Sequence, residues 1–184
     1  MFSRIYTLFG GDVRLLAPGG EVNVGLATPP ASFGIAKPAS ELGIVVQSVG
    51  DVQSLSYGDF QVNESRVFAG DGGDILVWST RGDIDAGRGA KTAISAPPPV
   101  ITIDQQGQPK VEFPAAFVGS GIQTLATTPD VEPGDVDLFA PRGVVVAAGL
   151  FCEQRGPATE RLTIALRARG DEQAAERLVP LRAP

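Results

Sequence analysis

Hydrophobic and polar residues alternate along four short segments, and each segment follows a Gly-Asp pair. In every copy the pair leads into a five-residue alternating run that ends in Ala or Ser, and a further glycine opens a second alternating run. Period-two alternation predicts β-strands, because successive side chains of a strand point to opposite faces. The copies begin at Gly11, Gly50, Gly73 and Gly134. The chain is therefore predicted to be a repeat protein built from pairs of short strands.

One face of the first strand in each copy is apolar or small. It comprises the first, third and fifth residues after the aspartate: Val13, Leu15, Ala17; Val52, Ser54, Ser56; Ile75, Val77, Ser79; and Val136, Leu138, Ala140. A single unit of this size cannot bury its apolar face, whereas stacked units bury it against one another. We therefore expect an all-β fold, a right-handed parallel β-helix (solenoid) with inserted β-hairpin segments. Val13, Ile75 and Val136 should be buried in parallel strands.

The opposite face carries a large apolar residue four positions after each aspartate. These residues, which we call the outer column, are Leu16, Leu55, Trp78 and Phe139. Four large apolar side chains in one column indicate a covered surface or a contact surface. We expect residues 93–133 to fold back over part of the column, with Phe113 and Phe117 in contact with it.

Two proline-containing segments, residues 26–49 and 93–133, interrupt the repeat. In the second, the runs 100–103 and 110–113 flank a polar stretch, which predicts a hairpin. We therefore expect residues 1–149 to form the β-helix domain with these two insertions.

The tail, residues 150–184, has a different pattern from the rest of the chain. Residues 159–169 and 171–179 each have the apolar spacing and end signals of an amphipathic helix. The tail is therefore either a helical cap or a non-native, frame-shifted end.

Composition narrows the possible functions of these 184 residues, which suffice for one domain. The 23 glycines and 15 prolines favour turns and short strands. The net charge of −6 disfavours a nucleic-acid partner, and the lack of histidine removes imidazole-dependent catalysis and the commonest zinc sites. No apolar run is long enough for a transmembrane helix. The N-terminus lacks a signal peptide, so the chain is expected to be intracellular or, as the repeats favour, a piece of a larger protein.

Three longer strings around the Gly-Asp turns carry a family resemblance. Residues 7–20 (TLFGGDVRLLAPGG), 82–92 (GDIDAGRGAKT) and 134–143 (GDVDLFAPRG) resemble a C-terminal-side region of the large filamentous haemagglutinin-type adhesins of two-partner secretion. The likeness covers about residues 5–145. It implies a secreted or bacterial cell-surface β-helix, exported through an outer-membrane transporter by signals near the N-terminus of the full-length protein. It implies no catalytic residues and no cofactor.

Several short motifs are candidate sites. Arg81, Gly82 and Asp83 form an RGD tripeptide, a loop that some integrins bind, although this corner of the repeat needs glycine in any case. A second RGD lies at residues 169–171. Residues 70–74 (GDGGD) are similar to one turn of a calcium-binding repeat, but such sites need tandem copies, so a plain turn is favoured and no metal site is expected. Residues 87–92 lack the glycine before lysine that a phosphate loop requires, and Cys152 is taken as an incidental or buried thiol.

The leading functional hypothesis is a structural and adhesive fragment of a large secreted surface protein that extends or displays a fibre. A host cell-surface receptor or glycan is the expected partner. One alternative is a polysaccharide lyase or hydrolase on the same fold, for which the pairs Asp83 with Asp85 and Asp135 with Asp137 are candidate carboxylates. The absence of histidine and of a convergent acid–base pair argues against enzymatic turnover. The other alternative is a truncated remnant without independent function.

Overall fold

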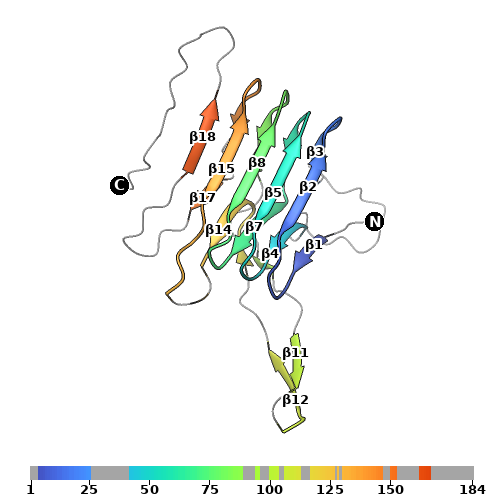
Figure 1. Ribbon diagram of the computed structural model, residues 1–184, viewed down its shortest axis with the longest axis vertical. Helices are drawn as coiled ribbons and strands as arrows, with labels where there is room; N and C mark the ends of the chain where they lie inside the picture. Colours follow the sequence, from blue (N-terminus) through green and yellow to red (C-terminus); the bar gives the residue numbers. More distant parts are fainter. Residues whose placement is uncertain are drawn as a thin grey trace.

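A computed structural model shows the chain as a stack of coils in which each complete coil contributes one strand to each of three parallel sheets (Figure 1). The structure describes residues 4–25, 42–88, 94–95, 100–103, 106–112, 117–126, 128, 130–146, 150–152 and 162–166. None of these residues is helical.

Each sheet collects the equivalent strand of successive coils. Sheet A contains β1 (Arg4–Thr7), β4 (Gly43–Val46), β7 (Arg66–Gly70), β14 (Gly121–Leu125) and β17 (Leu150–Cys152). Sheet B contains β2 (Val13–Ala17), β5 (Val52–Ser56), β8 (Ile75–Ser79), β15 (Val136–Ala140) and β18 (Leu162–Leu166). Sheet C contains β3 (Val22–Asn23), β6 (Phe60–Gln61), β9 (Ile84–Asp85) and β16 (Val145–Val146).

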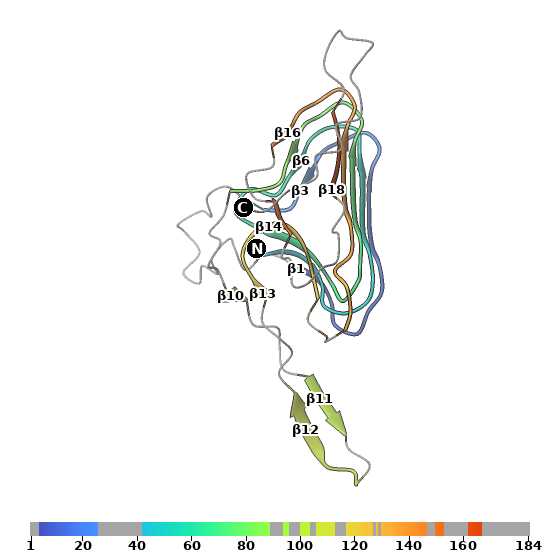
Figure 2. The same ribbon diagram turned by 90° about the vertical axis from the view of Figure 1, so that its left-hand side faces the viewer.

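All strand pairs within these three sheets are parallel. The chain rises along sheet B on the near side in Figure 1, crosses at the top through sheet C and returns through sheet A, while the coils advance from right to left. This sense of winding is right-handed, as expected for parallel crossovers between twisted strands. The predicted right-handed parallel β-helix is confirmed, and Figure 2 shows its three-sided cross-section.

Equivalent residues of successive coils stack in the core. Val52 pairs in register with Ile75, and Ile75 with Val136, and these three side chains are 0%, 1% and 1% exposed. Val13, at the end of the same row, is 7% exposed. Sheet C adds Phe60 and Ile84, which are also fully buried. The prediction that Val13, Ile75 and Val136 are buried in parallel strands is therefore confirmed.

Sheet A was not predicted from the sequence. Its strands β4 and β14 lie inside the segments 26–49 and 93–133, which the sequence analysis treated as interruptions of the repeat. Every residue of β4, β7 and β14 is buried, so both faces of these strands are covered. Strands of this kind lack period-two alternation, which explains why the pattern missed them.

The insertion between β9 and β14 contains two antiparallel pairs. The predicted hairpin is confirmed as β11 (Val100–Ile103) paired with β12 (Pro109–Glu112), one residue earlier than expected in its second strand. β10 (Ile94–Ser95) pairs with β13 (Phe117–Val118). Figure 2 shows β10 and β13 beside sheet A, on the opposite side of the coil from sheet B, and the hairpin extending away from the coils.

The described part of the tail is strand rather than helix. β17 extends sheet A, and β18 pairs in parallel with β15 along its whole length, so the helix predicted over residues 159–169 is wrong. The apolar residues Leu162, Ile164 and Leu166 also alternate with period two, and the open edge of β15 supplies backbone partners that favour the strand. The second predicted helix, residues 171–179, lies outside the described residues.

Candidate functional surfaces

The aspartates of the Gly-Asp pairs form a ladder at the corner where sheet A leads into sheet B. The Asp12 side chain accepts a hydrogen bond from the Asp51 backbone N–H at 3.2 Å, and Asp51 accepts from Asp74 N–H at 3.0 Å. Asp74 accepts in turn from Asp135 N–H at 2.7 Å. Each carboxylate therefore satisfies a backbone donor on the next coil, where no strand pairing is available.

The glycine of each pair allows the coils to approach closely. A Cβ atom added to Gly73 would lie 2.1 Å from the Gly50 carbonyl oxygen, and one added to Gly134 would lie 2.1 Å from the Gly73 carbonyl oxygen. Any side chain here would collide with backbone of the neighbouring coil. The recurrence of glycine therefore follows from the spacing of stacked strands, which is about 4.8 Å.

A second ladder occupies the corner between sheets B and C. The Asp59 side chain accepts from Asp83 N–H, and the Asp83 side chain accepts from Val144 N–H, both at 2.8 Å. A Cβ atom on Gly82 would lie 2.3 Å from backbone atoms of Gly58 and Asp59. The sequence analysis placed these glycines at a turn but missed the ladder, although Gly-Asp at residues 58–59 and 82–83 was a visible signal.

The RGD tripeptide lies on this second corner. Arg81 and Asp83 are exposed, and the Arg81 guanidinium lies 5.6 Å from the centre of the Tyr57 ring. Gly82 is held against the neighbouring coil, and one carboxylate oxygen of Asp83 serves the ladder. All three residues therefore have a structural role. The second tripeptide, residues 169–171, lies outside the described residues.

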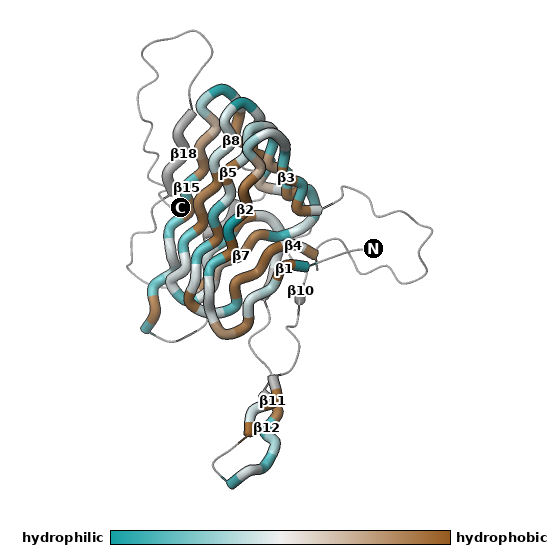
Figure 3. The backbone as a smooth tube through the Cα atoms, turned by 45° about the vertical axis from the view of Figure 1, so that its right-hand side comes forward, coloured by the Kyte–Doolittle hydropathy of each residue, from teal (hydrophilic) through white to brown (hydrophobic). Residues whose placement is uncertain are grey.

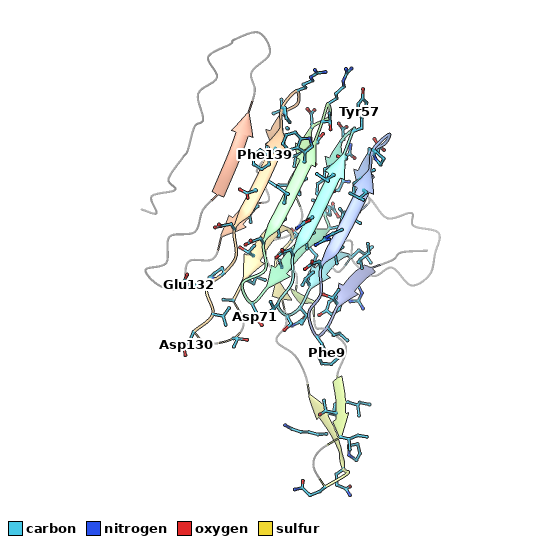
Figure 4. All side chains as sticks on the ribbon, viewed as in Figure 1. Phe9, Tyr57, Asp71, Asp130, Glu132 and Phe139 are labelled. Atoms are coloured by element: carbon cyan, nitrogen blue, oxygen red, sulfur yellow. The ribbon has the colours of Figure 1, made fainter. Side chains whose placement is uncertain are left out.

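The turn at residues 70–74 is closed by a hydrogen bond from the Gly73 N–H to the Gly70 carbonyl at 3.1 Å and is joined to Thr128 through Asp71. Asp71 has φ 48° and accepts from the backbone N–H and the hydroxyl of Thr128, at 2.9 and 3.0 Å. Figure 4 shows Asp71, Asp130 and Glu132 at the lower end of the coils. Among the described residues, no group of three or more Asp, Glu, His or Cys residues is arranged to hold a metal ion.

The carboxylates considered for glycan cleavage also have local structural roles. Asp85 accepts from Gly87 N–H at 3.0 Å and forms an ion pair with Arg88 at 3.5 Å. Asp135 belongs to the first ladder, and Asp137 lies on the outer face of sheet B beside Leu76. The two candidate pairs therefore lie on different faces of the coil. Cys152 ends β17, and its side chain lies outside the described residues.

The outer face of sheet A is buried in β4, β7 and β14 and includes polar side chains. The hydroxyl of Tyr6 donates to the Gln47 side chain, and the Arg66 guanidinium lies 5.3 Å from the centre of the Phe68 ring. Burial raises the pKa of Tyr6 to about 12, against smaller opposing effects of Arg4 and Arg66. A raised pKa means that the folded state favours the neutral phenol. The contribution of Tyr6 to the free energy of unfolding is therefore fully present below pH 10 and is lost as the pH rises toward 12.

The outer column on sheet B is formed as predicted, and three of its four side chains are exposed while Phe139 is half-buried. Leu16 pairs in register with Leu55, Leu55 with Trp78, and Trp78 with Phe139. The Trp78 and Phe139 ring centres lie 5.6 Å apart. Leu16, Leu55 and Trp78 are 73%, 45% and 38% exposed. The expected cover by residues 93–133 is therefore wrong, because the described strands of that insertion lie away from sheet B; the Phe113 and Phe117 side chains lie outside the described part.

Comparison with known proteins finds one family model that matches part of the chain. Residues 72–155 match the family model described as "Filamentous haemagglutinin family outer membrane protein". This match confirms the resemblance predicted from the Gly-Asp strings at residues 82–92 and 134–143, whereas the string at residues 7–20 lies outside the matched range. The matched segment includes the third and fourth repeats and extends into the first residues of the tail, which the sequence analysis had set apart. No curated protein and no solved structure matches the chain significantly.

The haemagglutinin-family description implies a secreted or cell-surface location and supports an adhesin-like role at that surface. The described residues include no helix that is both long and apolar enough to cross a membrane.

Proposed function

We propose that the chain is a structural and adhesive segment of a large secreted bacterial surface protein, in which the coils extend a fibre and display its faces to host surfaces. The observation that carries this proposal is the pair of Asp ladders, which continue from coil to coil on two corners. Such ladders are what a rod of repeating coils requires. The match to a haemagglutinin family supports the adhesive part, and export through an outer-membrane transporter belongs to the same proposal.

Adhesion can be tested with beads coated with the purified chain. We expect the folded chain to hold beads on cultured host cells, whereas a Val77→Asp variant should not, because a charge replaces a fully buried side chain and unfolds the coils. Equal retention of beads coated with folded chain, Val77→Asp variant or an unrelated protein would contradict an adhesive role for this segment. It would leave the fibre-extending role to be judged by the deletion experiment at the end of the Discussion.

The contribution of the RGD tripeptide can be separated from its structural role by Asp83→Asn. The asparagine keeps a side-chain oxygen that accepts from Val144 N–H but removes the carboxylate charge. We propose that attachment through Arg81, Gly82 and Asp83 is secondary, and we expect this variant to retain most bead adhesion. Loss of adhesion with an unchanged unfolding midpoint would instead assign cell attachment to the tripeptide.

A further inference from the structure

The outer face of sheet B combines apolar and charged residues in two parallel columns. The outer column holds Leu16, Leu55, Trp78 and Phe139, while the second column, two residues earlier in each strand, holds Arg14, Gln53, Leu76 and Asp137. In the second column, Arg14 lies on the outermost strand β2 and also forms an ion pair with Asp12 at 3.0 Å, whereas Asp137 lies on β15, beside the last strand β18. Figure 3 shows this sheet obliquely, with the backbone coloured by the hydropathy of each residue.

We propose that this face is a docking surface for a second copy of the chain. A rotation of 180° about an axis parallel to the strands, between β5 and β8, brings two sheet B faces together. It reverses the order of the strands but keeps each residue's height along its strand. β2 then faces β15 of the second copy, and β5 faces β8. The interface is isologous, which is the commonest form of protein self-association.

The residues that meet in this arrangement are complementary. Leu16 lies opposite the partner's Phe139, and Leu55 lies opposite the partner's Trp78, so the outer columns cover each other. Arg14 lies opposite the partner's Asp137 on both sides of the axis, while β18 extends past the partner's β2. Gln53 faces the partner's Leu76, which is a neutral pairing. A two-fold axis along the stack of coils and midway between the two columns would instead place the outer column against the second column. The axis parallel to the strands places opposite charges face to face, which favours this orientation.

The area of the face sets the expected affinity of the dimer. Four strands about 4.8 Å apart and five residues long give a face of roughly 300 Å². This area is well below the ~800 Å² per partner of a stable interface, so the association should be weak and reversible. The inference goes beyond the proposed adhesive role and does not depend on it.

Trp78 reports the association without any mutation, because it is the only tryptophan in the chain. We expect iodide to quench its fluorescence in dilute solution and to quench it less as the concentration rises from about 10 µM to about 1 mM, the range in which weak complexes form. Sedimentation equilibrium over the same range should show a monomer–dimer equilibrium. If the chain stays monomeric and iodide quenching of Trp78 does not change with concentration, the proposal is overturned, and this face does not bind a second copy.

Exposed substitutions test the geometry. Leu55→Gln should weaken dimerisation about tenfold or more. Val144→Gln changes an exposed apolar residue outside this face and should not weaken it.

Arg14→Asp and Asp137→Arg should each weaken dimerisation about 3- to 10-fold, while the double variant should restore it. The matched charge reversals Arg142→Asp and Glu132→Arg, both at exposed positions outside this face, should have no effect. Failure of the double variant to restore dimerisation would contradict the two-fold arrangement.

Discussion

At the scale of single residues, the Gly-Asp pair explains why the repeat has its sequence. The glycine leaves room for the neighbouring coil, and the aspartate satisfies that coil's backbone N–H. The alternation and the pair itself could be recognised in the sequence. The contacts from one coil to the next could not be recognised in the sequence. They join residues that are 23 to 61 positions apart, and the insertions set these separations.

Gly73→Ala should destabilise the protein by at least about 2 kcal/mol, because the new methyl group would overlap the Gly50 carbonyl oxygen and force neighbouring coils apart. Gly19→Ala is the matched control, since its added methyl group meets no atom within 4 Å. That change should alter the free energy of unfolding by less than about 0.5 kcal/mol. Urea unfolding followed by far-UV circular dichroism measures both, and equal effects would contradict the close-approach explanation.

At the scale of strands, the sequence predicted the elements whose two faces differ and missed those whose faces are both buried. β2, β5, β8 and β15 alternate between core and surface and were predicted with their inward residues. β4, β7 and β14 do not alternate and were missed. The outer column was predicted because it follows from the period of sheet B. The exposure of the outer column was not predicted, because the path of an insertion depends on tertiary contacts that no local sequence pattern records.

Two serines on the inward face of β5 give opposite predictions. The Ser54 hydroxyl is fully buried and has no hydrogen-bond partner in the described structure, whereas the Ser56 hydroxyl donates to the Gly58 carbonyl at 2.9 Å. Ser54→Ala should stabilise the protein by about 1 kcal/mol, because it removes an unsatisfied buried polar group. Ser56→Ala should destabilise it by a similar amount. Thermal unfolding of the two variants side by side checks the pair, and a loss of stability in Ser54→Ala would count against a dry core at this position.

At the scale of the whole molecule, both insertions leave the coil at the same corner, between sheet C and sheet A. One separates β3 from β4 and the other separates β9 from β14, whereas β6 and β7 are joined directly. A stack of coils accommodates extra residues at a corner because the strands before and after the insertion keep their pairing. The coil itself, and not the full spacing between Gly-Asp pairs, is therefore the structural unit.

The most direct test of this account is an in-frame deletion of residues 50–72. The uninterrupted repeat is 23 residues long, as the spacing from Asp51 to Asp74 shows, so the deletion joins Val49 to Gly73 and removes one coil. We predict that the shortened chain keeps a β-sheet circular dichroism spectrum and unfolds cooperatively, with a smaller urea dependence because less surface is buried. Deletion of residues 50–60, about half a coil, should abolish the fold because the remaining strands lose their register. If the two deletions unfold the protein alike, or if only the shorter one is tolerated, the chain is not a stack of 23-residue coils.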